Sequence, residues 1–94
     1  MSAVLTDHSA VAIWKRAIEP KCGNMARAEA KAMLRLKLAA ADLDRADLLA
    51  AKARAGRLKP QEEQELDNYR TVGSVIEFLK SKARRSLRRL PAAA

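Results

Sequence analysis

The feature that most constrains this chain is a long stretch without a strong helix breaker, which begins at Pro60 and ends before Pro91. Proline suits the first position of a helix, because the N–H that it lacks would have no partner there. Three glutamates follow within five positions and complement the positive end of a helix dipole. Gly73 costs about 1 kcal/mol relative to alanine, which does not end a helix. The stretch therefore predicts one helix of nearly thirty residues, about 45 Å long.

The apolar residues of this stretch recur at alternating spacings of three and four, which places them in one stripe along the helix. We expect the stripe to pack against other helices, and at Gly73 a neighbouring helix could approach the backbone closely. The shorter helices are not expected to cover its far end, so Leu87 and Leu90 would project or pair with another molecule. The stripe consists of Leu66, Tyr69, Val72, Gly73, Ile76, Leu79, Ala83, Leu87 and Leu90.

A short first helix is predicted over residues 10–19, with Asp7 or Ser9 as its cap. Its apolar face contains Trp14, the only tryptophan of the chain, which we expect to anchor the core. Pro20 cannot continue the hydrogen bonding of a helix, so it marks the end of this one, and a turn follows.

A second helix is predicted over residues 25–38 and a third over residues 42–55. The break between them is inferred from Asp42 and Asp44, because carboxylates suit the start of a helix. The alternative is one continuous helix through the three alanines that precede Asp42. Gly56 fits the left-handed position just past a helix end, so the third helix should stop there.

These elements predict an all-α fold, a small helical bundle of three short helices and one long C-terminal helix. Ala, Leu, Arg, Lys and Glu dominate the composition and favour helix, and no segment alternates apolar and polar residues as a strand does. The 94 residues form a single domain, with loose ends expected at residues 1–8 and 91–94. Leucine, isoleucine, valine and phenylalanine total only 20 residues, so a partner or a second copy could supply missing burial.

The strongest functional signal is the density of positive charge near the C-terminus. The chain has a net charge of +8, and six basic residues lie between positions 80 and 89. On a helix most of them spread over the side opposite the apolar stripe, and the other two extend this surface round the back. The predicted cationic surface consists of Lys80, Lys82, Arg84, Arg85, Arg88 and Arg89.

Such a surface predicts an acidic partner, with nucleic acid as the first choice and an acidic protein as the other. The alternative interpretation is a solvated helix end, whose cations complement the helix dipole. No aromatic residue lies among these basic residues, which disfavours stacking on the bases of a single strand. Binding to a membrane surface fits less well, because no Trp or Phe accompanies the leucines at this end.

No pattern in the chain predicts catalysis, or a metal or cofactor site. Asp42 and Asp44 lie about 200° apart on a helix, so the acidic residues in this region fit helix starts better than a metal cluster. His8 and Cys22 each stand alone, and a single cysteine excludes an intrachain disulfide. We expect a protein that is not an enzyme and has no small-molecule substrate. Because no apolar run could span a membrane and no secretion signal is visible, the expected location is the cytoplasm.

Five segments of the chain form a recognisable pattern, at residues 14–20, 52–56, 60–66, 69–73 and 81–87. The last of them, Ser-Lys-Ala-Arg-Arg-Ser-Leu, is the most specific. Together they resemble a widespread family of short, uncharacterised bacterial all-helical proteins, and the resemblance covers about residues 11–89. Members of that family are often encoded beside HNH endonucleases, which implies a partner role. Lys59 departs from the pattern, which usually has Ser or Thr there, and residues 39–41 replace a more apolar, proline-containing turn.

The leading hypothesis is therefore a small helical binding module whose basic C-terminal helix contacts an acidic partner. A rival hypothesis is a protein-interaction role, such as an inhibitor or accessory subunit of a neighbouring nuclease. A third is a self-associating structural protein, a homo-oligomer in which the long helix pairs with its copy. The residues expected in helix packing or in a protein interface are Trp14, Leu66, Tyr69, Gly73, Ile76, Leu79 and Leu87.

Overall fold

The computed structural model describes residues 7–19 and 25–91, and for residues 20–22 it describes the backbone alone. These residues form four α-helices and no strand, which confirms the predicted all-α class with three short helices and one long one. The expected loose ends fall mostly on residues 1–6 and 92–94, which lie outside the described part. The helices are α1 (Ala10–Cys22), α2 (Arg27–Leu34), α3 (Ala40–Arg54) and α4 (Pro60–Arg89).

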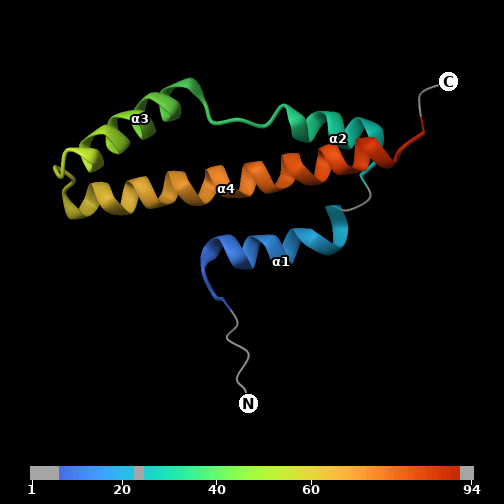
Figure 1. Ribbon diagram of the computed structural model, residues 1–94, viewed down its shortest axis with the longest axis horizontal. Coiled ribbons are helices and arrows are strands. Elements are labelled where there is room, and N and C mark those ends of the chain that lie inside the picture. The colour runs from blue at the N-terminus through green and yellow to red at the C-terminus, as the bar shows by residue number, and fades with distance from the viewer. Residues whose placement is uncertain (1–6, 23–24, 92–94) are drawn as a thin grey trace, which may run out of the picture.

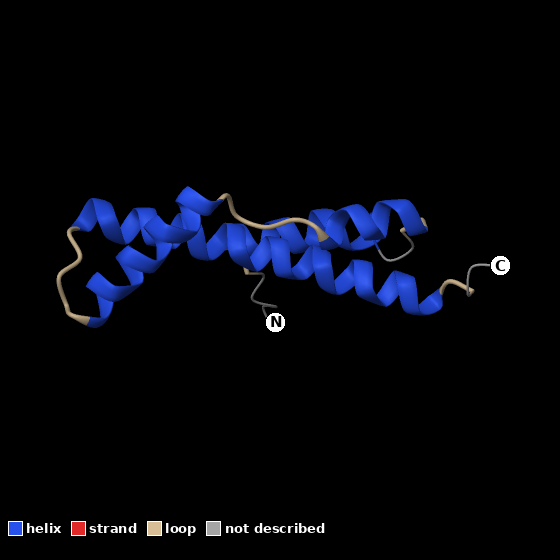
Figure 2. Ribbon diagram, turned by 90° about the horizontal axis from the view of Figure 1, so that it is seen from above, coloured by secondary structure: helices blue, strands red, loops and turns tan. Residues whose placement is uncertain are grey.

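The long helix α4 is the centre of the molecule (Figure 1), with α2 and α3 along one side of it and α1 on the other. Among the described residues, every contact between helices involves α4, so the three short helices do not touch one another. The resulting shape is flat (Figure 2), with extents of 54 × 45 × 16 Å. The radius of gyration is 16.9 Å, against about 12–13 Å for a compact chain of this length. The helices therefore pack singly on a rod and do not enclose a shared core.

Both predicted ends of α4 are confirmed. Pro60 is its first residue, and the backbone N–H of Lys59 donates to the Glu62 carboxylate at 3.0 Å. This bond supplies half of a capping box, so the helix begins firmly although lysine replaces the usual Ser or Thr. The helix ends at Arg89, two residues before Pro91.

The predicted end of the first helix is wrong, because α1 continues through Pro20 to Cys22. A proline removes one hydrogen bond and restricts the residue before it, but near a helix end the backbone can keep its helical geometry. At the start, Ser9 acts as the cap as predicted, since its Oγ accepts from the N–H of Ala12 at 3.2 Å. The predicted turn after Pro20 also included Gly23 and Asn24, which lie outside the described residues.

Helices α2 and α3 are separate, as the acidic residues at the start of α3 indicated, but the break lies earlier than predicted. Helix α2 spans Arg27–Leu34, and residues 36–39 form an extended connection to α3. The three alanines assigned to the break supply the N-cap and the first two residues of α3. Gly56 has a φ of 69° just past the end of α3, which confirms the predicted left-handed stop.

Buried apolar side chains are few and lie in two places along α4. Between α2 and the end of α4, a cluster contains Met25, Ala30 and Ala83, with Leu87 packed against it. The expectation that nothing covers Leu87 is therefore wrong, because α2 lies over that end of the rod. Between α3 and the start of α4, the buried residues are Leu49 and Leu66. The molecule has two small cores joined by one continuous helix.

Two further predictions about packing are wrong. Trp14 does not anchor the core, because it is 52% exposed. It lies on α1, which contributes no buried apolar residue among those described. The sequence allowed a neighbouring helix to approach the backbone closely at Gly73, yet a Cβ built there would meet nothing within 4 Å. No other helix therefore packs closely on α4 at Gly73.

Candidate functional site

The basic residues near the end of α4 divide into exposed and buried groups. Arg84, Arg85 and Arg88 are exposed, and Lys80 is half-buried. Within the described part of the chain, none of these four forms an ion pair with a carboxylate. Arg89 is also exposed but is engaged in an interaction within the chain. We call Lys80, Arg84, Arg85 and Arg88 the cationic face.

Lys82 does not belong to this face, which corrects the prediction that it extends the surface. Its side chain is only 8% exposed, and its Nζ forms an ion pair with Glu19 Oε1 at 2.6 Å. The same Nζ lies over the ring of Phe78, 5.3 Å from the centroid, and Lys15 of α1 approaches that ring at 5.7 Å. A buried charge needs such a partner to offset its lost hydration. Lys82 therefore docks α1 onto α4 and is not available to a partner.

Glu19 is the carboxylate that borders the cationic face. The hydrogen bond and charge of Lys82 lower the pKa of Glu19, and the charge of Arg85 lowers it further. Glu19 thus stays ionised at neutral pH and neutralises Lys82, while its side chain remains 58% exposed. Arg85 lies close enough to sense this carboxylate without forming an ion pair with it.

The segment at residues 81–87, which carries the most specific part of the family resemblance, contains both buried residues that contact other helices and exposed residues. Ala83 is fully buried against α2, and Ser86 is 2% exposed. The Oγ of Ser86 accepts a hydrogen bond from the backbone N–H of Met25 at 3.1 Å, which ties the start of α2 to α4. The residues between them, Arg84 and Arg85, point to solvent. The segment therefore holds two helices in place and presents cations on its remaining side.

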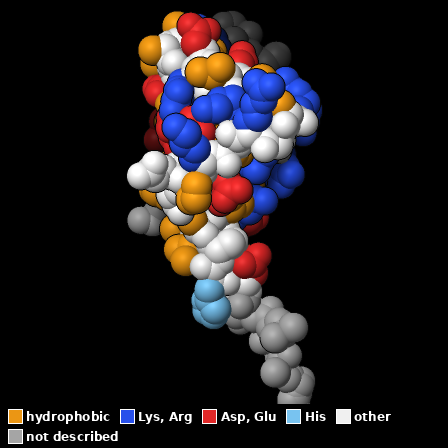
Figure 3. Space-filling model, turned by 90° about the vertical axis from the view of Figure 1, so that its left-hand side faces the viewer, with side chains coloured by type: hydrophobic (Ala, Val, Ile, Leu, Met, Phe, Trp, Pro, Cys, Tyr) orange, Lys and Arg blue, Asp and Glu red, His pale blue; other side chains and the backbone are white. Residues whose placement is uncertain are grey.

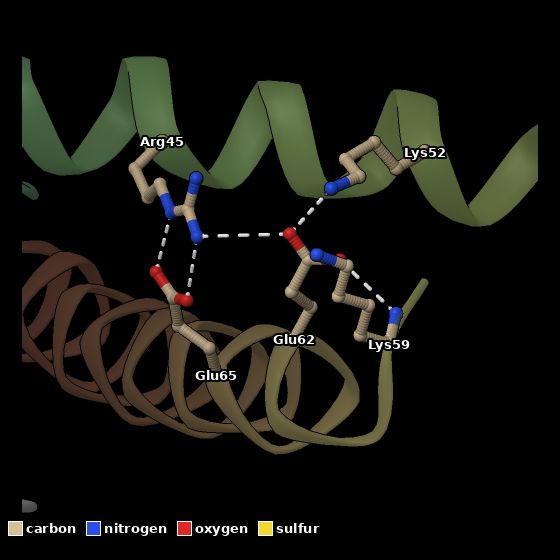
Figure 4. A network of polar contacts seen from close by, with 5 residues as sticks. All are labelled: Arg45, Lys52, Lys59, Glu62 and Glu65. Carbon is tan, nitrogen blue, oxygen red and sulfur yellow. Dashed lines mark hydrogen bonds and ion pairs between the residues drawn. The ribbon is translucent and has the colours of Figure 1, made fainter. Parts of the chain in front are cut away.

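At the other end of α4, a polar network joins α3 to the first turns of the rod (Figure 4). Arg45 donates two hydrogen bonds to Glu65, at 2.6 and 2.9 Å, and its Nη2 lies 4.0 Å from Glu62. Lys52 forms an ion pair with Glu62 on the same side. Hydrogen bonds from Lys52 and from the Lys59 backbone lower the pKa of Glu62, and hydrogen bonds from Arg45 lower the pKa of Glu65.

Tyr69 completes the contact between α3 and α4. Its hydroxyl donates to Asp42 Oδ1 at 2.7 Å, and this bond raises the pKa of the phenol. Asp42 is one of the carboxylates that the sequence assigned to a helix start, and it lies in the first turn of α3. Several acidic residues of this region are thus occupied by their own chain and hold α3 in place.

The predicted interface residues are not brought together into one surface. Leu66 is buried under α3, Tyr69 bonds to α3, and Leu79 is half-buried. Trp14 and Ile76 remain accessible and line a small cleft of about 150 Å³ with their neighbours on α4. Along α4, the stripe therefore packs first against α3, is then accessible at Ile76, and finally packs against α2.

Charge is distributed unevenly between the two halves of the molecule. Positions 40–70, which form α3 and the start of α4, hold six basic and seven acidic residues, whereas the remaining positions hold thirteen basic and four acidic residues. Figure 3 looks onto the end formed by α3 and the start of α4, where Lys and Arg are mixed with Asp and Glu. The net positive charge therefore belongs to the half that contains the cationic face.

Helix α2 contributes cations that the sequence analysis missed. Lys31, Arg35 and Lys37 are exposed and follow one another on and just after α2, which packs against the same end of α4. These residues lie about fifty positions before the basic residues of α4. Their place in the sequence therefore did not indicate that the fold brings the two groups to the same end of the molecule. They extend the basic half beyond α4 itself.

The described residues offer no group of three His, Cys, Asp or Glu side chains that could hold a metal ion. His8 is exposed. A larger cleft of about 530 Å³ separates the start of α1 from α4, and its charged lining residues, Asp67 and Arg70, pair with each other at 3.8 Å. No helix in the described part combines the length and apolar character needed to cross a membrane.

Comparison with known proteins adds no relative. No family model matches the chain, and neither the curated proteins nor the solved structures contain a match. The resemblance in residues 11–89 to short bacterial helical proteins, and the nuclease partner that it implies, therefore stay predictions. The inference about function therefore rests on the geometry and the charge of the cationic face.

Proposed function

We propose that this protein is a non-enzymatic helical binding module that contacts the phosphate backbone of nucleic acid through the cationic face. The observation that carries the proposal is the set of three exposed arginines on α4, at positions 84, 85 and 88, none of which forms an ion pair with a carboxylate within the described chain. Guanidinium groups bind phosphate oxygens in a bidentate manner, and condensed counterions are released when they do.

The competing interpretation, a solvated helix end, accounts for only part of this face. The attraction between cations and the helix dipole falls off within the last turn. Because α4 ends at Arg89, this effect can explain Arg88 and Arg89. Arg84 and Arg85 lie more than a turn from the end of α4, and both are exposed to solvent. A partner with negative charge supplies the reason for cations at those two positions.

The geometry favours recognition of the backbone over recognition of bases. The three aromatic residues lie elsewhere: Phe78 is covered by two lysines, Tyr69 bonds to α3, and Trp14 lies on α1. Without an aromatic platform beside the arginines, single-stranded bases have nothing to stack on. A rigid helix holds its guanidinium groups in fixed positions, which suits the regularly spaced phosphates of a duplex. The expected binding depends strongly on salt and weakly on sequence.

Titration of a short DNA duplex at several salt concentrations tests this function. If the three exposed arginines each neutralise one phosphate, the slope of log K against log salt is about −2.7. Affinity then falls about 40-fold between roughly 50 and 200 mM salt. Fluorescence anisotropy of a labelled duplex measures the slope directly, and an RNA duplex in parallel distinguishes the two nucleic acids.

A pair of double variants separates the cationic face from net charge. Arg84→Gln with Arg88→Gln should reduce the steepness of the slope by about 1.8. Arg54→Gln with Arg57→Gln removes the same charge from exposed positions at the other end of the molecule, and it should leave the slope unchanged. Affinity that does not change with salt, or an equal loss in both variants, would refute the proposal.

A further inference from the structure

The same short sequence pattern occurs in α2 and in α4, where the two helices pack against each other. A basic residue is followed by alanine three positions later and by a second basic residue next to that alanine. Leucine then follows after three further positions, with a third basic residue next to it. The equivalent pairs are Arg27 with Lys80, Ala30 with Ala83, Lys31 with Arg84, Leu34 with Leu87, and Arg35 with Arg88.

Burial is also equivalent at each position of the two patterns. Ala30 and Ala83 are both fully buried in one core cluster, and Leu34 and Leu87 pack against it. The first basic residue of each pattern is half-buried, and the second and third are exposed. The two helices therefore meet through equivalent residues.

Helices α2 and α4 run in opposite directions (Figure 1). The backbone N–H of Met25, which precedes α2, donates to Ser86 near the end of α4, and Arg27 donates to the carbonyl of Pro91 just past that end. An antiparallel pair that packs through equivalent residues has a local twofold axis perpendicular to both helices. Such an axis keeps equivalent side chains on the same face of the pair, so the exposed cations of α2 share a face with those of α4.

This shared face carries two rows of cations, and none of them forms an ion pair within the described part of the chain. Each row has two exposed basic residues four positions apart, about 6 Å along the helix. The one acidic residue within the two patterns is Glu29, whose carboxylate accepts from the N–H of Ala26 at 3.0 Å and so caps α2. The rows are Lys31 with Arg35 on α2, and Arg84 with Arg88 on α4.

The spacing of the two rows suits two strands of phosphates. The axes of two packed helices lie about 8–10 Å apart, and the grooves that separate the strands of a DNA duplex are about 6 to 12 Å wide. A single strand offers one tract of phosphates, whereas a duplex offers one on each side of a groove. We infer that the α2 row and the α4 row contact the two strands of a duplex across one groove. This inference rests on the proposed function, to which it adds a second set of contacts and a preference for double strands.

The number of phosphates neutralised tests the inference. The α2 row adds two contacts to the three arginines of α4, so the slope of log K against log salt for a DNA duplex should be about −4.5 and not about −2.7. Lys31→Gln with Arg35→Gln should return the slope to about −2.7, with unchanged helix content in circular dichroism. Arg54→Gln with Arg57→Gln, the matched control, should leave it at about −4.5. A single strand of the same length should give a slope no steeper than about −2.1, because its one tract follows the α4 row.

The possible failures of this inference and of the proposed function are distinguishable. A duplex slope of about −2.7 that the substitutions at Lys31 and Arg35 leave unchanged would overturn the two-row contact and leave the proposed function intact. A single-strand slope as steep as the duplex slope would also overturn it. Affinity that is independent of salt for every nucleic acid would refute the proposed function itself. Vesicles of phosphatidylcholine and phosphatidylserine serve as a further probe, and binding to them without binding to a duplex would assign the rows to a membrane surface and contradict the inference.

Discussion

Replacing Leu49 with alanine tests whether α3 is held on α4 by a buried side chain. Leu49 is fully buried, whereas the adjacent Leu48 is 51% exposed. Leucine and alanine both favour helix, so neither substitution changes helix propensity by much. The two variants Leu49→Ala and Leu48→Ala therefore compare the same chemical change at two levels of burial.

The magnitude follows from how Leu49 is enclosed. A buried leucine cut back to alanine costs about 2–5 kcal/mol in proteins, with the larger values where the cavity cannot collapse. Here α3 contacts only α4 among the described helices, so the surroundings can relax, and we expect about 2–3 kcal/mol. For a chain of this size that lowers the Tm by about 10–20 °C. Leu48→Ala should cost less than about 1 kcal/mol, since half of that side chain already meets water.

Urea unfolding followed by circular dichroism at the helix band measures both changes. The Leu49 variant should unfold at lower urea concentration with a similar slope, and the Leu48 variant should follow the unmodified protein closely. Equal effects of the two substitutions would show that α3 does not present Leu49 to α4. The variants and the unmodified protein should be compared at the same protein concentration, because any association between copies would add to apparent stability.

Three further predictions concern the polar network between α3 and α4, Gly73 and Gly56. The pKa values of Glu62 and Glu65 lie below the ordinary 4.5, so their contribution to stability is complete above about pH 4.5 and is lost as the pH falls through the lowered values. Glu62→Gln with Glu65→Gln should flatten the fall of the Tm between about pH 7 and pH 3, whereas Glu63→Gln, at an exposed neighbour, should not. Gly73→Ala should raise stability by about 0.5–1 kcal/mol, because it lies inside a helix with open space around it. Gly56→Ala should lower stability by about 1–2 kcal/mol in the same melts, because φ is positive there.

The elements with strong local signals were predictable from the sequence. Pro60, the glutamates after it and the absence of a further proline before Pro91 defined α4, and Gly56 defined the end of α3. Pro20 misled, because the helical backbone of α1 continues for two residues past it, although a proline disfavours this. The extent of α2 was also missed, since the extended connection at residues 36–39 is required by where α2 and α3 pack along α4, and no residue in it is a helix breaker.

The candidate site was predictable only in outline. Charge density located the basic end of α4, but sequence could not separate Lys82 from its neighbours. What separates them is Glu19, which lies more than sixty positions away and is brought to Lys82 by the docking of α1. The same limitation applied to Trp14, whose helical spacing predicted burial although no third helix packs on that side. Contacts between distant segments decided both outcomes.

Within the segment at residues 81–87, some residues hold helices together and others are free to contact a partner. Packing and partner binding must therefore be tested by substitutions at different positions. Helix α4 is bound on two sides, where Lys82 contacts α1 and where Ala83 and Ser86 contact α2 and the residue that leads into it. Substitution of Lys82, Ala83 or Ser86 therefore changes binding only through loss of the docked helices, which would appear as lost helix content. Substitution of Arg84 or Arg88 leaves every described interhelical contact in place, so a change in the salt dependence of binding at these positions reports on the partner alone.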